Sequence, residues 1–147
     1  MYSYILLLHI LAATIWTGGH LVLATTVLPR ALAARDPGIL LAFESGFERV
    51  GMPALLIQIA SGLWMAHAML PDMRAWFSLS TPPAMLITFK LALLGITVIT
   101  ALDARFRIIP KLSAETLPAM ARRVAIVTTV SVLFVVVGVS FRGGLLA

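Results

Sequence analysis

Four long apolar runs dominate this sequence, at about residues 4–27, 51–70, 84–102 and 124–141. A helix needs about 20 mostly apolar residues to cross the hydrocarbon core of a bilayer, and each run reaches roughly that length. Only 12% of the residues are charged and 61% are hydrophobic, whereas soluble domains carry about 25% charged residues. The pattern predicts an all-α integral membrane protein in which residues 1–147 form one antiparallel bundle of four transmembrane helices.

Basic residues are distributed unevenly among the connections, and this predicts how the chain is oriented. Short cytoplasmic loops are rich in lysine and arginine. The first and third connections contain Arg30, Arg35, Arg49, Arg105, Arg107, Lys111, Arg122 and Arg123. The second connection and the C-terminal tail have one each, Arg74 and Arg142. We expect a multi-pass protein of a bacterial-type cytoplasmic (inner) membrane with both termini extracytoplasmic, whose net charge of +5 faces anionic lipid rather than nucleic acid.

Three histidines, His9, His20 and His67, lie within or at the edge of the apolar runs. An ionisable side chain inside a membrane is costly and is a functional-site candidate by default. Because the chain has no cysteine, disulfides, c-type haem attachment, iron–sulfur clusters and thiolate metal sites are all excluded. The remaining candidate ligands are histidine, methionine and carboxylate side chains.

His9 and His67 are predicted to meet near the outer side of the membrane. His9 lies early in the first run and His67 near the end of the second, so an antiparallel hairpin brings their levels together. Lys90 in the third run and Arg142 at the end of the fourth are expected at the same end. Two opposed imidazoles suit the axial positions of haem b, with the cations on its propionates or on a quinone carbonyl. A two-histidine copper site or a plain interhelical hydrogen bond explains the same residues.

His20 shares a helical face with His9 and Trp16, since eleven residues at about 100° each return to nearly the same direction. The rise of about 1.5 Å per residue separates His20 from His9 by about 16 Å, too far for one mononuclear metal centre. His20 is therefore a candidate ligand of a second, inner site, and Trp16 is expected either to pack on a cofactor or to fill the core. The neighbours expected for His20 are Glu44, Glu48, Arg49, Met52 and Asp103.

Methionines provide the case for copper. Met65, Met69 and Met73 recur at every fourth position around His67. Thioether and imidazole ligands suit Cu(I), although methionines at helical spacing also serve as flexible packing. The residues alone leave haem b and copper both open.

Short motifs in the first three runs and their connections resemble those of the HemJ-type protoporphyrinogen oxidases. These motifs are Leu8-His9-Ile10, Trp16-Thr17-Gly18-Gly19, Leu28-Pro29-Arg30, Phe47-Glu48-Arg49, Met52-Pro53-Ala54 and Lys90-Leu91. The resemblance implies that His9 ligates haem and that Lys90, Arg49 and Glu48 are functional polar residues. It further implies that, if the protein is an enzyme, it is a membrane haem-dependent oxidoreductase. His20 and His67 have no match in the HemJ pattern.

The same first run is also similar to the membrane domain of copper-resistance protein D (CopD). The similarity extends to Ala104-Arg105-Phe106-Arg107 and Pro110-Lys111-Leu112. It implies that His9 and neighbouring methionines or histidines handle copper.

Three functional classes follow from the sequence. The main prediction is a haem b-binding membrane protein that transfers electrons, with quinone or a periplasmic redox protein as partner. The alternative is a CopD-type copper transport or resistance protein with a periplasmic copper partner, and an accessory subunit without a cofactor is the third class. Small-residue faces at Gly62, Gly95 and Gly138 also suit a homo-oligomer.

Overall fold

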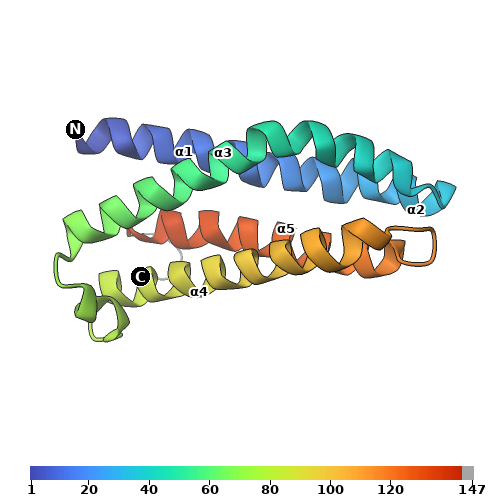
Figure 1. Ribbon diagram of the computed structural model, residues 1–147. Helices are drawn as coiled ribbons and strands as arrows, with labels where there is room; N and C mark the ends of the chain where they lie inside the picture. The colour runs from blue at the N-terminus through green and yellow to red at the C-terminus, as the bar shows by residue number, and fades with distance from the viewer. Residues whose placement is uncertain (144–147) are drawn as a thin grey trace.

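The computed structural model describes residues 1–143, and within this range the chain folds into long helices connected by short turns. In chain order, the α-helices are α1 (Tyr2–Val22), α2 (Leu28–Ala34), α3 (Pro37–Met69), α4 (Pro82–Asp103) and α5 (Leu117–Ser140). They make up four helical rods that are each long and apolar enough to cross a membrane (Figure 1). The predicted all-α bundle of four membrane helices is confirmed.

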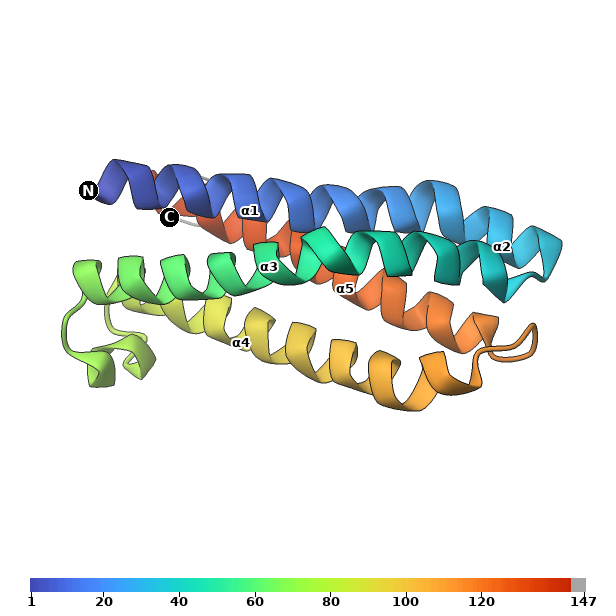
Figure 2. The same ribbon diagram turned by 45° about the horizontal axis from the view of Figure 1, so that its top comes forward.

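The rods form two antiparallel hairpins that lie side by side. The first rod packs against α3, α4 packs against α5, and α5 also packs against α1 (Figures 1 and 2). Met1 and the end of α5 lie at the same end of the bundle. We call this the outer end, in keeping with the predicted orientation, and the end with the α2–α3 and α4–α5 connections the inner end.

Two of the rods widen just before a proline. A π-helical turn at Leu23–Val27 joins α1 to α2 ahead of Pro29. A second one, Ala104–Ile108, continues α4 into a 3₁₀ turn at Ile109–Lys111 that contains Pro110. Proline has no N–H and its ring crowds the carbonyl one turn back, so the regular hydrogen-bond ladder shifts there. Both wide turns lie toward the inner end.

Side chains fix the connections at the two ends of α3. At the inner end, the Asp36 carboxylate accepts a hydrogen bond of 2.8 Å from the Gly38 N–H, and Pro37 occupies the first helical position. At the outer end, the buried Trp76 of the 3₁₀ turn Met73–Phe77 donates from its indole N–H to the Leu70 carbonyl at 2.8 Å. The Thr88 hydroxyl of α4 donates to the Trp76 carbonyl, so the turn is attached to both helices.

A cluster of buried apolar residues lies toward the inner end, whereas large apolar side chains cover the outside of the rods. The cluster consists of Leu23, Val27, Leu28, Ala31, Leu40, Ala104, Leu117, Met120 and Val124. On the outside, Ile99 and Phe106 are 70% and 71% exposed. Soluble monomers rarely present such extended apolar surface, so these faces contact lipid.

Candidate functional site

A cavity of about 210 Å³ lies among the four rods toward the inner end. Aromatic side chains of α1 and α3, Trp16, Phe43 and Phe47, form part of its wall. Its charged, imidazole and sulfur-bearing lining residues are His20, Glu44, Glu48, Met52, Arg105, Met120 and Arg123. We call it the inner cavity.

His20 is held in one tautomer with its second nitrogen available. Its Nδ1 lies 2.9 Å from the Trp16 carbonyl oxygen, and since a carbonyl only accepts, Nδ1 carries the proton. Nε2 then has a lone pair and no hydrogen-bond partner in residues 1–143. The Thr128 hydroxyl donates to the His20 carbonyl at 3.2 Å, which ties this turn of α1 to α5. An imidazole with one N–H held by a carbonyl is the arrangement typical of a metal ligand.

Aromatic packing fixes the orientation of the His20 ring. Its centroid lies 4.4 Å from that of Trp16 and 5.6 Å from that of Phe47, which it meets edge-on. Phe47 in turn occupies space left by two glycines: a Cβ at Gly19 would lie 2.1 Å from its ring, and one at Gly51 2.8 Å. Gly19 therefore lets Phe47 of α3 pack against α1, and Gly51 leaves room for the same ring on its own helix.

Ion pairs connect helices around the cavity. Arg105 pairs with Glu48 at 2.9 Å, joining the end of the third rod to α3. Arg123 of α5 pairs with Asp103 of α4 at 2.6 Å, and its Nε donates to the same carboxylate at 2.8 Å. Glu44 lines the cavity and takes part in no ion pair in the described part of the chain. Glu44 is therefore the lining carboxylate that lies outside these ion pairs.

The His9 ring is held differently, across the helix interface. Its Nδ1 lies 2.8 Å from the Ser61 hydroxyl, which itself donates to the Ile57 carbonyl at 2.5 Å. Because serine has a single hydroxyl proton, Ser61 accepts from His9, so here too Nδ1 carries the proton. The ring lies against Gly62, where a Cβ would be 3.2 Å from its Cε1. His9 thus acts as a cross-helix contact between α1 and α3.

Lys90 lies close enough to His9 for its charge to act on the ring. Its Nζ is 5.5 Å from the Phe141 ring centroid, a cation–π contact, and 3.5 Å from where a Cβ at Gly138 would be. Gly62 and Gly138 therefore pack within the chain against His9 and Lys90, whereas Gly95 has open space around it.

The residue of α3 that contacts His9 is Ser61 rather than the predicted partner His67. His67 is exposed and lies six residues beyond Ser61, about 9 Å farther along α3. The register of the hairpin explains this: His9 and Ser61 are each about two turns from the outer ends of their helices. His9 Nδ1 is engaged by Ser61, and the role of His9 and His67 as a pair of haem b ligands stays a prediction.

The other predicted site residues are placed as follows. Trp16 packs with His20 in the inner cavity, so it belongs to the inner histidine rather than to His9. Arg142 is exposed at the outer end, and Lys90 is directed toward Phe141. Arg49 is exposed and lies on a different surface from the cavity. The ligand and cofactor roles of these residues stay predictions.

The donor set of the inner cavity includes sulfur. Residues 1–143 contain no group of three or more histidine, aspartate or glutamate side chains placed to hold a metal ion. Methionine sulfur is the further side-chain donor that the cavity offers beside His20 and the carboxylates. Met120 lines the cavity at 5% exposure and Met52 at 45%.

The family model described as copper resistance protein D, CopD, matches residues 41–141. The chain belongs to the CopD family. No match is found among curated proteins or among solved structures. The match includes Met52 and Met120 of the cavity but begins after His9 and His20, so membership of the CopD family by itself assigns no role to either histidine.

Sequence reasoning missed Met120 and Ser61. The fourth apolar run starts at residue 124, whereas α5 begins at Leu117, so Met120 lies outside the predicted span. The signal was Pro118, since proline favours the first turn of a helix. Ser61 is a hydroxyl inside an apolar run, a residue type that forms hydrogen bonds between membrane helices.

Proposed function

We propose that this CopD-family protein binds copper in the inner cavity and carries it through the membrane as cargo. The observation that supports the proposal is the pairing of an oriented imidazole, with Nε2 available, and a buried thioether in the same cavity. These are His20 and Met120. The family match supports the choice of metal.

The ligand types favour Cu(I) over harder cations. Thioether sulfur and imidazole nitrogen select Cu(I), whereas Mg²⁺ and Ca²⁺ prefer oxygen ligands. Met52 at the edge of the cavity adds a second thioether, and Glu44 offers a carboxyl group. Trp16 and Phe47 provide an apolar, aromatic wall beside the ion.

Exposed sulfur at the outer end suits the capture of copper from a periplasmic partner. Met69 and Met73 are 40% and 59% exposed. His67, in the last turn of α3, is exposed as well. Cu(I) delivered there enters the bundle at the end opposite the inner cavity. In this scheme His67 acts as a surface residue of the entry region.

Copper titration of the purified protein tests the proposal. We expect one Cu(I) per chain to be retained against a chromogenic Cu(I) chelator. Met120→Leu removes the thioether and keeps an apolar side chain of similar volume, so affinity should fall at least about tenfold while the fold persists. Met85→Leu is the matched control, because Met85 lies on α4 and is not among the cavity residues. Equal affinities for both variants would contradict the site.

The visible spectrum of the same preparation tests the competing prediction. A Soret band that shifts on addition of dithionite, in a sample without copper, would favour haem b and overturn the copper proposal. Uptake of Cu(I) into proteoliposomes, lost in Met120→Leu and kept in Met85→Leu, then distinguishes transport from binding alone.

A further inference from the structure

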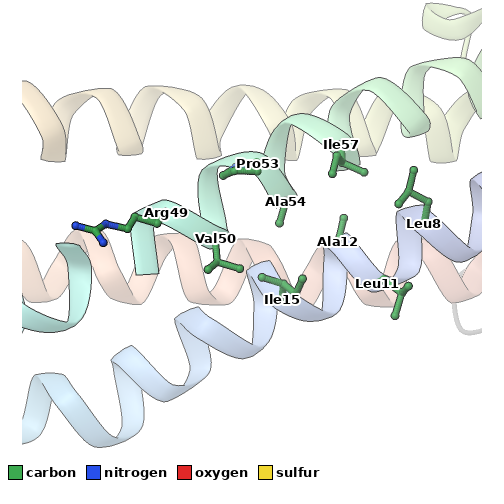
Figure 3. A pocket seen from close by; sticks show the side chains of 9 residues that line it. All are labelled: Leu8, Leu11, Ala12, Ile15, Arg49, Val50, Pro53, Ala54 and Ile57. Atoms are coloured by element: carbon green, nitrogen blue, oxygen red, sulfur yellow. The ribbon is translucent and has the colours of Figure 1, made fainter. Parts of the chain in front are cut away.

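A second hollow, of about 400 Å³, lies on the outside of the bundle between α1 and α3 (Figure 3). Ala12 and Ala54 are buried between the two helices at this point, at 3% each. The exposed apolar side chains along it are Leu8, Leu11, Ile15, Val50 and Ile57. Arg49 lies at one end, and Figure 3 shows its side chain extending away from the apolar ones. We call this surface the α1–α3 groove.

We propose that the α1–α3 groove binds an anionic glycerophospholipid, with an acyl chain along the apolar side chains and the phosphate on Arg49. Apolar shape alone does not select a lipid, because lipid tails are as apolar as the side chains that line the groove. Selection therefore depends on the head group, and the groove offers one cation for it.

Arg49 is placed at the depth of a head group. It is the last charged residue of α3 before an uncharged stretch that extends through residue 71. A boundary of this kind marks the level where hydrocarbon meets the polar region, and anionic lipids interact with basic residues there. Arg49 is exposed and makes no ion pair or side-chain hydrogen bond in the described chain. A lipid phosphate supplies the missing partner.

Pro53 adds a preference for a head group with hydroxyls. Proline has no N–H, so it cannot close the helical hydrogen bond to the carbonyl of residue 49, one turn back. That carbonyl lies on the same side of α3 as Pro53, which lines the groove. A glycerol head group carries hydroxyl donors for this acceptor as well as the phosphate for Arg49. Phosphatidylglycerol meets both requirements.

The test uses the full chain in nanodiscs of equal parts dioleoyl phosphatidylglycerol and dioleoyl phosphatidylcholine, followed by native mass spectrometry of protein with retained lipid. We expect the phosphatidylglycerol adduct to exceed the phosphatidylcholine adduct. An interfacial arginine contributes about 1 kcal/mol with anionic lipid, so Arg49→Gln should lower this enrichment about fivefold. Arg74→Gln, an exposed arginine of the outer turn, should leave it unchanged.

A second variant tests the groove itself. Val50→Trp fills the groove from its exposed side, so retention of phosphatidylglycerol should fall although Arg49 is intact. Equal retention of the two lipids by the unmodified chain, or unchanged enrichment in Arg49→Gln, would overturn the proposal. A lipid-free dimer as the dominant species would also overturn it, because a second copy would then be the occupant. Copper affinity should be the same in Arg49→Gln, so this result is independent of the inner cavity.

Discussion

The two histidines of α1 lie on the same helical face, yet their surroundings differ. Both carry the proton on Nδ1 and leave Nε2 as an acceptor. The Nδ1–H of His9 is held by a side chain of another helix, and the ring fills the space above Gly62. The Nδ1–H of His20 is held by its own helix, and the ring faces a cavity of about 210 Å³. The same residue type therefore joins helices at one level and is available for a ligand at the other.

The charges around the two histidines differ in the same way. Lys90, the cation near His9, lies over the Phe141 ring. Near His20, cations and carboxylates are paired across helices, and Glu44 is left over. The two carboxylates and two arginines that line the inner cavity balance in charge, so a cation bound there depends on its ligands and on the room that the cavity offers.

Alanine at each histidine gives the largest contrast. His20→Ala should lower Cu(I) affinity more than about 100-fold, because removal of a ligand exceeds the 10–100-fold effect of disturbing its supporting contacts. His9→Ala should leave affinity within about twofold. Chelator competition measures both, with circular dichroism to verify helix content. A larger loss in His9→Ala would place the copper site at the outer level instead.

Two adjacent glycines provide the next contrast. A Cβ at Gly19 would lie 2.1 Å from Phe47, whereas a Cβ at Gly18 meets nothing within 4 Å. Gly19→Ala should destabilise the protein by about 1–3 kcal/mol through overpacking. Gly18→Ala should be neutral or stabilise the protein by about 0.5–1 kcal/mol, because alanine loses less backbone entropy than glycine when the helix forms. Thermal unfolding in detergent measures the difference.

A double variant identifies the cause of the Gly19 effect. If the clash with Phe47 is responsible, Phe47→Leu in the Gly19→Ala background should recover part of the lost stability. An unchanged melting temperature in the double variant would mean that the phenylalanine is not the constraint.

The positions of the rods could be predicted from the sequence because hydrocarbon length and hydropathy determine them directly. Their ends could not, since α3 begins at Pro37, well before the apolar run at residue 51. Counting residues from the ends of the apolar runs placed His9 level with His67. Counting from the ends of the helices places His9 level with Ser61, which it contacts. The outer ends lie within two residues of the predicted ones, Tyr2 against residue 4 and Met69 against residue 70, so a shift of a few residues was enough to place Ser61 instead of His67 level with His9.

The inner site was predictable in part. Residue spacing placed His20 apart from His9, and depth in the membrane named Glu44, Glu48, Arg49, Met52 and Asp103 as its neighbours. Glu44, Glu48 and Met52 line the cavity with His20, whereas Arg49 and Asp103 do not. Residue spacing could not identify Phe47 or Met120, because their positions depend on how α3 and α5 pack against α1. Packing between helices has no signature in the periodicity of one helix.

Ser61→Ala separates the structural role of His9 from any ligand role. It removes the acceptor of the His9 Nδ1–H, and hydrogen bonds between membrane helices are worth about 0.6 kcal/mol on average and up to about 1.7 kcal/mol. We expect a loss of stability in this range and no change in copper affinity. Nitrogen NMR of labelled histidine should show the Nδ1–H tautomer of His9 becoming less dominant. A histidine spectrum identical to that of the unmodified protein would mean that Ser61 does not set the tautomer.

The smallest expected difference is between the two ion pairs beside the inner cavity. Arg105 and Glu48 are 52% and 41% exposed, so solvent screens their attraction, and Glu48→Gln should change stability by less than about 0.5 kcal/mol. Asp103 is 24% exposed, contacts Arg123 at 2.6 Å and also faces Arg107 at 3.4 Å. Asp103→Asn leaves two arginines without their carboxylate, so its melting temperature should fall below that of Glu48→Gln. Equal melting temperatures would show that the α4–α5 connection is held by apolar packing alone, and the inner cavity would then owe its shape to its side-chain volumes rather than to its charges.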